Sequence, residues 1–196
     1  ITFKNPSSQK IYIIKGYNMK KQSVPKIDKD KIQTWFVTGA SSGVGHELCS
    51  QLLKRGYNVV AVSRRVPDFQ DERVLCLSCD VTDPESVKNA VAKGIAHFGR
   101  IDVLSNNAGI STSVVLEEET TEHIESFMQT NFYGTFNTIK ALLPHFRENK
   151  NGTIINNSSM HGLSSRKGGA AYCSSKHAIE GLTSVCLLET EKFCRT

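Results

Sequence analysis

The sequence lacks the features that mark several other classes of protein. Its 196 residues include no run of about 18 apolar residues, which excludes a transmembrane helix and leaves no expectation of a membrane partner. After residue 31 there is no internal repeat and no low-complexity tract. With 39% hydrophobic and 22% charged residues, the composition is that of an ordinary globular protein and excludes a disordered or fibrous chain.

The excess of positive charge is confined to the start of the chain. Residues 1–31 hold eight lysines and two aspartates, whereas the following 165 residues hold 16 basic and 17 acidic side chains. The net charge of +5 is therefore no argument for a nucleic-acid partner. We expect residues 1–30 to be a disordered basic leader, because they are polar, contain two prolines and show no sustained period. The alternative is a basic arm that binds an acidic surface.

Cysteine spacing predicts neither a disulfide framework nor a metal site. The six cysteines are scattered, and none of the six histidines stands at zinc-type spacing from them. Cys76 and Cys79 match the C-x-x-C pattern inside an apolar, strand-like run, which favours two thiols in a strand over a redox motif. Residues 1–31 contain no apolar stretch long enough for a signal peptide. Thiols without an export signal indicate a cytoplasmic location.

From Thr34 onward, short apolar strands alternate with amphipathic helices. Strands are predicted at 35–38, 58–63, 74–79, 101–105 and 153–157. Helices are predicted at about 44–55, 87–98 and 120–149, with a last one from about 172 to the end of the chain. This alternation predicts an α/β fold, a doubly wound parallel sheet of Rossmann type covered on both faces. We therefore assign residues 31–196 to one domain of this type.

A glycine-rich turn joins the first predicted strand to the first predicted helix. Glycines permit a tight turn and a close ligand, and a helix start offers unpaired N–H groups to a pyrophosphate. The turn is predicted to bind a dinucleotide through Gly39, Ser41, Ser42, Gly43, Val44 and Gly45. Its G-x-x-x-G-x-G spacing differs from the common dinucleotide fingerprint, so the alternative is a glycine-rich loop without a ligand.

The end of the second predicted strand indicates which dinucleotide is bound. An acid there would bind the ribose hydroxyl of NAD, whereas a basic group would receive the additional phosphate of NADP. The strand ends with Ser63, Arg64 and Arg65, and no carboxylate occupies this position. This favours NADP over NAD; the alternative is two surface arginines that end a strand.

With four further motifs, the chain from about Thr34 resembles the short-chain dehydrogenase/reductase family. These motifs are Asp80-Val81, Asn106-Asn107-Ala108-Gly109, Asn131 in Asn-Phe-Tyr-Gly, and Ser159 followed by Tyr172-Cys173-Ser174-Ser175-Lys176. The resemblance implies cofactor contacts at Asp80, Val81, Asn107, Ala108, Gly109, Tyr172 and Lys176. It also implies a catalytic set of Asn131, Ser159, Tyr172 and Lys176, in which Asn131 holds a water that connects the lysine to solvent.

The catalytic pair can also be argued from its spacing. Tyr172 and Lys176 stand four residues apart, so a helix presents both on one side. A cation near a phenol stabilises the phenolate and favours proton transfer near neutral pH. Ser159 can stabilise charge on a substrate oxygen, whereas strand alternation sends Ser158 to the other face. We therefore predict an oxidoreductase that moves hydride between NADP and a small carbonyl or alcohol substrate; the alternative is a non-catalytic NADP-binding regulator.

The chain departs from the family in length. Only 20 residues follow Lys176, whereas family members run to about 250 residues. We expect the fold to be incomplete at the C-terminus, with the fifth strand at an edge and the substrate-binding part missing, so an inactive truncated fragment is a further alternative. A completed chain is expected to form a homodimer or homotetramer. Its contacts would involve the helices around Asn131 and after Tyr172, including Leu182, Val185 and Leu188.

Overall fold

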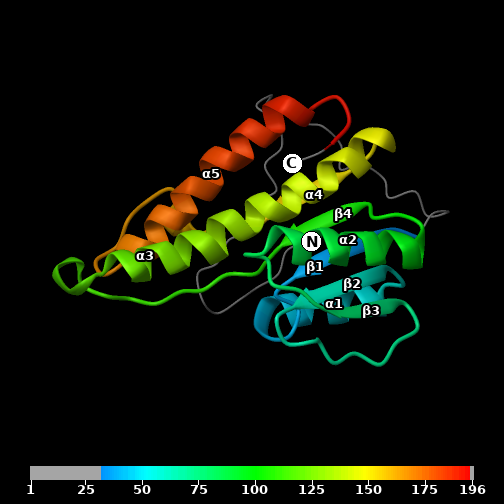
Figure 1. Ribbon diagram of the computed structural model, residues 1–196, viewed down its shortest axis with the longest axis horizontal. Coiled ribbons are helices and arrows are strands. Elements are labelled where there is room, and N and C mark those ends of the chain that lie inside the picture. The colour runs from blue at the N-terminus through cyan, green and yellow to red at the C-terminus, as the bar shows by residue number, and fades with distance from the viewer. Residues whose placement is uncertain (1–31, 195–196) are drawn as a thin grey trace.

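Five parallel strands form the centre of the fold in the computed structural model, which describes residues 32–194 (Figure 1). The sheet order is β3-β2-β1-β4-β5. The strands are β1 (Thr34–Thr38), β2 (Asn58–Ser63), β3 (Val74–Ser78), β4 (Val103–Asn106) and β5 (Thr153–Asn156). The predicted doubly wound α/β fold is confirmed, whereas the predicted leader lies outside the described residues.

Five α-helices connect and cover these strands within residues 32–194. They are α1 (Gly43–Lys54), α2 (Pro84–Phe98), α3 (Thr121–Phe127), α4 (Gly134–Glu148) and α5 (Ala170–Thr190). A π-helical segment, Met128–Tyr133, joins α3 to α4, and 3-10 turns occur at Leu116–Glu118 and Met160–Gly162. No helix in the described part of the chain is long and apolar enough to cross a membrane.

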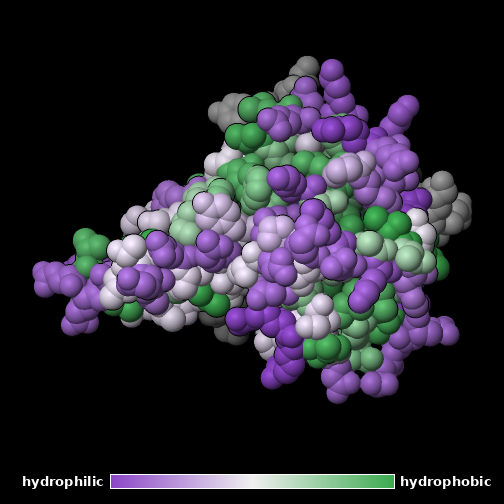
Figure 2. Space-filling view, viewed as in Figure 1, coloured by the Kyte–Doolittle hydropathy of each residue, from purple (hydrophilic) through white to green (hydrophobic). Residues whose placement is uncertain are grey.

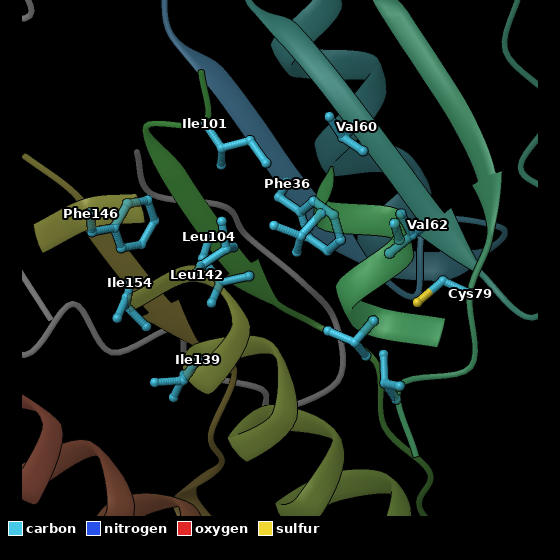
Figure 3. Close-up of a cluster of buried hydrophobic side chains, with 14 of the residues drawn as sticks. Phe36, Val60, Val62, Cys79, Ile101, Leu104, Ile139, Leu142, Phe146 and Ile154 are labelled. Carbon is cyan, nitrogen blue, oxygen red and sulfur yellow. The ribbon is translucent and has the colours of Figure 1, made fainter. Parts of the chain in front are cut away.

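The sheet buries a different hydrophobic cluster on each face. Because side chains alternate along a strand, Phe36 of β1 faces one cluster and its neighbour Val37 faces the other. The larger cluster, shown in Figure 3, joins the sheet to α2 and α4 through buried side chains such as Leu142 and Phe146. On the other face, α1 packs with Cys49, Leu52 and Leu53. Helices thus lie on both faces, as the sequence predicts.

The buried stripe of α1 differs from the predicted one. The spacing of Val44, Leu48 and Leu52 predicts one inward face, but Val44 and Leu48 are only half-buried. The buried side of the helix instead follows Gly45, Cys49 and Leu52. The reason is the glycine, since a β-carbon on Gly45 would lie 2.4 Å from the Gly39 carbonyl oxygen. This backbone contact fixes how the helix is rotated on the sheet.

Two other helices end or break where the pattern predicts continuity. The predicted helix over 120–149 is interrupted by the π-helical segment that contains Asn131. The last helix was expected to reach the end of the chain, but α5 ends at Thr190. There the Thr190 carbonyl accepts hydrogen bonds from the amides of Phe193 and Cys194 at 2.9 and 2.8 Å. This turn returns the chain to the larger cluster, where Cys194 is buried.

The strand order places a crevice at the carboxyl ends of β1 and β4. These strands are neighbours, but the chain leaves β1 toward β2 and leaves β4 toward β5, on opposite sides. Such a switch point is where parallel sheets bind ligands. On the outer side, β5 pairs with β4 alone among the described strands, as predicted. Cys76 lies in β3 and Cys79 follows it, both as free thiols, which agrees with the strand interpretation.

Candidate active site

The Thr38 hydroxyl joins the two strands that border the crevice. Thr38 ends β1, and its Oγ1 accepts hydrogen bonds from the backbone amides of Asn107 and Ala108, both at 2.9 Å. The Asn107 side chain donates back to the Thr38 carbonyl at 3.3 Å and accepts from the side-chain Nδ2 of Asn157 at 3.2 Å. The end of β1, the Asn106-to-Gly109 segment and the end of β5 are therefore held in one geometry.

The glycine-rich turn fits tightly against this segment and is open on its other side. Gly39 has φ of +67°, and a β-carbon there would lie 2.9 Å from the Ala108 Cα. Gly43 has φ of +57°, yet apart from its chain neighbours and its own helix backbone no atom lies within 4 Å of the β-carbon position. Ser42 precedes α1 without a side-chain capping bond, and the first turn of α1 contains no acid. These features fit a pyrophosphate at the open side of the turn.

The other predicted cofactor residues lie around the same end of the sheet. The Ser41 and Ser63 hydroxyls are 2.9 Å apart, which joins the turn to the end of β2. Arg64 and Arg65 follow β2 and are exposed. Asp80 follows β3, where its carboxylate accepts bonds from Thr82, and the next residue, Val81, is buried. The strand end carries Ser63 followed by two arginines, and no acidic residue stands there.

Lys176 and Tyr172 lie together on the first turns of α5. Tyr172 is 6% and Lys176 5% exposed, and the Lys176 Nζ lies 5.7 Å from the centre of the Tyr172 ring. The same Nζ donates to the Asn157 carbonyl at 2.7 Å. Burial lowers the pKa of Lys176 from 10.5 to about 8, and the charge of Glu180 opposes this by raising it.

Asn131 is fully buried in the π-helical segment, and its side chain connects this segment to Ile110 after β4 and to Ser175 of α5. Its Oδ1 accepts from the Ile110 amide at 2.8 Å, and its Nδ2 donates to the Ile110 carbonyl at 3.1 Å and the Ser175 hydroxyl at 2.9 Å. Gly109 lies against this group, since a β-carbon there would be 3.1 Å from the Asn131 Oδ1 and 3.8 Å from the Lys176 Nζ. Asn131 therefore positions α5 beside the segment that follows β4.

Ser159 follows β5 and begins the turn that faces Tyr172. Its hydroxyl accepts a hydrogen bond from the His161 amide at 3.1 Å and is 3% exposed. The His161 ring stands edge-on to the Tyr172 ring with 6.4 Å between centres. Ser158 is also buried, but its hydroxyl has no hydrogen-bond partner in the structure. It lies beside Gly162, where an added β-carbon would be 2.7 Å from it. His177 is exposed and bonds back to the Cys173 carbonyl, away from the pair.

The structure adds contacts that sequence motifs do not reveal. The partner of Lys176 is the Asn157 carbonyl, and no side-chain pattern predicts a backbone acceptor. Arg166 places its guanidinium carbon 6.0 Å from the centre of the Tyr172 ring. The Ser175 hydroxyl accepts a hydrogen bond from Asn131. Its position in the sequence between Tyr172 and Lys176 is the signal that could have indicated a role at the site. The Thr38 hydroxyl could have been noticed as the residue that opens the glycine-rich turn.

The chain belongs to the short chain dehydrogenase family, whose family model matches residues 33–193. It is 40% identical over 161 residues to a 3-ketodihydrosphingosine reductase of Bacteroides thetaiotaomicron, which covers 82% of this chain and 60% of that protein. It is 35% identical over 159 residues to dehydrogenase/reductase SDR family member 7 of Homo sapiens, covering 74% of this chain and 47% of the relative. The chain thus spans about half to three fifths of these relatives' length.

Solved structures of the family share the fold. A short-chain dehydrogenase from Streptomyces avermitilis superposes with a TM-score of 0.79 at 34% identity, covering 84% of this chain and 62% of that one. ElxO with NADP bound superposes with a TM-score of 0.77 at 34% identity, covering 84% of this chain and 71% of that one. Members of this family use NAD or NADP, which agrees with a dinucleotide at the glycine-rich turn.

The buried Lys176 predicts a pH dependence of stability. The folded chain releases this proton near pH 8, whereas the unfolded chain holds it up to about pH 10.5, so the unfolded state binds more protons between these values. The free energy of unfolding of the wild type, minus that of Lys176→Met, should therefore be flat below pH 8. It should rise by up to about 3 kcal/mol toward pH 10.5.

Urea unfolding at several pH values measures this difference. Lys93→Met removes the same charge from an exposed position on α2 and is the matched control. A difference that stays constant from pH 7 to 10.5 would show that the Lys176 ammonium is not held out of water.

Proposed function

We propose that this chain carries the active site of an NADP-dependent oxidoreductase that acts on a small carbonyl or alcohol substrate. The observation that supports this most directly is the buried Lys176 ammonium at 5.7 Å from the Tyr172 ring, beside the switch point of the sheet. A buried cation beside a phenol is costly for folding and favours proton transfer by that phenol. The nicotinamide, when bound, supplies the hydride for reduction or receives it in oxidation.

In the proposed reduction, Tyr172 donates a proton to the substrate oxygen while the carbonyl carbon receives hydride. The developing phenolate is stabilised by the Lys176 ammonium. In the reverse direction Tyr172 takes the proton from the alcohol. Because burial lowers the pKa of Lys176 to about 8, this ammonium can itself pass a proton near neutral pH.

Ser159 and Asn131 have supporting roles in this proposal. The Ser159 hydroxyl already accepts from the His161 amide, so its own hydrogen is available to donate to a substrate oxygen. The Asn131 side chain uses both amide hydrogens in protein bonds, so a water linking Lys176 to solvent would have to donate to an oxygen of this residue. The side-chain Oδ1 accepts the Ile110 amide at 2.8 Å and has a second lone pair for such a water.

NADP is the proposed cofactor because positive charge follows β2. The phosphate carried by NADP would meet the exposed Arg64 and Arg65, while the serine pair of Ser41 and Ser63 brings neutral hydroxyls to the same place. The Lys176 side chain is proposed to bind the nicotinamide ribose. Asp80, Val81, Asn107, Ala108 and Gly109 border the proposed dinucleotide site from β3 and β4.

A homodimer or homotetramer is the proposed assembly, with α5 in the contact. Of the three apolar side chains considered on this helix, Leu182 packs against the larger cluster of its own chain. Val185 and Leu188 are 51% and 75% exposed and stand three residues apart on one side of α5. Figure 2 shows other hydrophobic groups on the face in view, beside hydrophilic side chains. On α5 itself, Val185 and Leu188 are the apolar side chains proposed for the contact.

Replacing Tyr172 by Phe tests the proposed chemistry. The change removes one hydroxyl, so folding and NADPH binding should persist, whereas kcat should fall by about 10²–10⁴-fold. Steady-state kinetics on a carbonyl substrate and NADPH titration measure the two effects. Tyr133→Phe, which removes the same hydroxyl from an exposed ring, should change neither. If Tyr172→Phe keeps most of its turnover, another group donates the proton.

Replacing Arg64 by Gln tests the proposed cofactor. Loss of a charge-assisted contact should raise the Kd for NADPH about 10-fold or more and leave that for NADH unchanged. Adding Ser63→Asp should reverse the preference, because the new carboxylate repels the phosphate and can bind a ribose hydroxyl. Fluorescence titration measures each Kd, with Arg55→Gln at the exposed end of α1 as the equal-charge control. Equal affinity of the wild type for both dinucleotides would contradict the assignment.

The assembly is tested by placing charge on the outer side of α5. Sedimentation velocity at micromolar concentration should show the wild type as a dimer or larger species. Val185→Glu combined with Leu188→Glu should dissociate it, because buried unpaired carboxylates are strongly unfavourable. Leu116→Glu is the matched control, since Leu116 and Leu188 are both 75% exposed. A wild type that sediments as a monomer would refute the proposal.

A further inference from the structure

A cavity without any acidic group opens beside the first turns of α5. It has a volume of about 330 Å³ and is lined by Ser165, Arg166, Gly169, Ala170, Cys173, Ser174 and His177. None of these residues belongs to the predicted catalytic or cofactor set. The lining residues include one arginine, one histidine, one cysteine and two serines, and no acidic residue. The composition suits an anion and disfavours a cation.

Arg166 connects this cavity to the proposed proton donor. Arg166 lines the cavity, and its guanidinium carbon lies 6.0 Å from the centre of the Tyr172 ring. One of its nitrogens, Nη2, donates to the Thr112 carbonyl at 3.1 Å. Within residues 32–194 Arg166 takes part in no ion pair. A guanidinium has five N–H donors, so most of its donors and its whole charge are available to a ligand.

The position of this guanidinium is fixed from both sides. Thr112, which accepts its bond, is held by a contact between its hydroxyl and His123 Nε2 at 3.1 Å. The His123 Nδ1 in turn contacts the buried carboxylate of Glu119. On the other side, the aromatic face of Tyr172 favours the cation. Arg166 therefore comes from an exposed segment but is attached at the edge of the active site. This segment leads into α5, whose first turn packs against α3 (Figure 1).

The remaining polar groups of the cavity can also serve a negative ligand. The His177 Nδ1 lies 2.9 Å from the Cys173 carbonyl, which can only accept, so this nitrogen carries a proton. The second ring nitrogen can then donate when the imidazole is charged. Ser165 and Ser174 are exposed hydroxyls that can donate as well. Several donors thus surround the space next to Arg166.

We infer that this cavity binds an oxyanion, a carboxylate or a phosphate group, through Arg166, and that the oxyanion is part of the substrate whose carbonyl oxygen Tyr172 protonates. The second half of this inference rests on the proposed function, whereas the first half does not. A substrate held at both ends would place its carbonyl at Tyr172 and its negative group on the far side of the guanidinium. The site would then select anionic carbonyl compounds over neutral ones of equal shape.

Direct titration of the whole chain with inorganic phosphate tests the anion site without turnover. Backbone amide resonances of residues 170–174 should shift saturably in two-dimensional NMR. Arg166→Gln should weaken the phosphate Kd about 10-fold or more, because it removes a charge-assisted contact. Lys167→Gln loses the same charge from the adjacent exposed residue, which does not line the cavity, and should change the Kd less than about two-fold. Absence of saturation, or equal weakening by both variants, overturns the site.

Paired carbonyl probes distinguish a substrate group from a free anion. We would compare 4-oxobutanoate and 6-oxohexanoate with their methyl esters in NADPH oxidation. The wild type and Lys167→Gln should show a KM about five-fold or more lower for the acids, and Arg166→Gln should lose this preference.

The possible outcomes separate the two halves of the inference. Equal KM values in the wild type, with phosphate still binding through Arg166, would assign the cavity to a free anion and overturn its role in substrate binding. If neither acid nor ester is reduced, the proposed function and the substrate half both fail. The phosphate titration then still decides the anion site.

Discussion

A lysine ammonium held out of water is the constraint around which the rest of this site is arranged. Lys176 is 5% exposed, and its ammonium donates a hydrogen bond to the Asn157 carbonyl at 2.7 Å. Burial of a charge with so little compensation is unfavourable, and the lowered pKa of about 8 reflects it. Such a group persists only where the surrounding structure fixes it. Here Asn131 and Gly109 close the space beside the ammonium, and α5 carries it at its second turn.

A buried polar network supplies the rigidity that this arrangement requires. The Asn106 and Asn156 side chains bond at 2.9 Å between β4 and β5. Thr138 of α4 donates to Asn106 at 2.6 Å, and Asn156 donates to Thr183 of α5 at 2.9 Å. All four side chains are buried. Hydrophobic packing alone would allow the helices to slide on the sheet, whereas directional bonds fix them at one position. The network thereby sets where α5 presents Tyr172 and Lys176.

Much of this could be predicted because the relevant signals are local. Strand β2 has the predicted bounds, and the C-terminal end of α2 falls at Gly99, which has the φ of +78° that such helix ends favour. The residues of the turn and of the α5 pair lie where their spacing places them. The two features that the sequence did not predict depend on backbone geometry. A contact of Gly45 with Gly39 rotated α1, and a π-helical segment interrupted the helix at Asn131. No pattern of side chains encodes either.

Two loops beside Tyr172, one after β4 and one before α5, bond to each other. Val114 and Gly169 form a parallel bridge, and the Ser113 hydroxyl and the Val114 amide both donate to the Gly168 carbonyl at 3.0 Å. Gly168 has φ of +67°, and a β-carbon there would lie 2.6 Å from the Ser113 Oγ, so only glycine fits without displacement.

The contacts of Ser113 and Val114 with Gly168 and Gly169, called the clasp here, join the segment after β4 to the segment that leads into α5. Arg166 lies on the second segment and bonds to the Thr112 carbonyl of the first, so it takes its position from the same clasp. The two segments therefore cannot move independently. A change that loosens these contacts is expected to displace the Arg166 guanidinium beside Tyr172. Under the proposed function, substrate specificity and proton transfer would therefore be coupled through backbone contacts that lie outside the catalytic motifs.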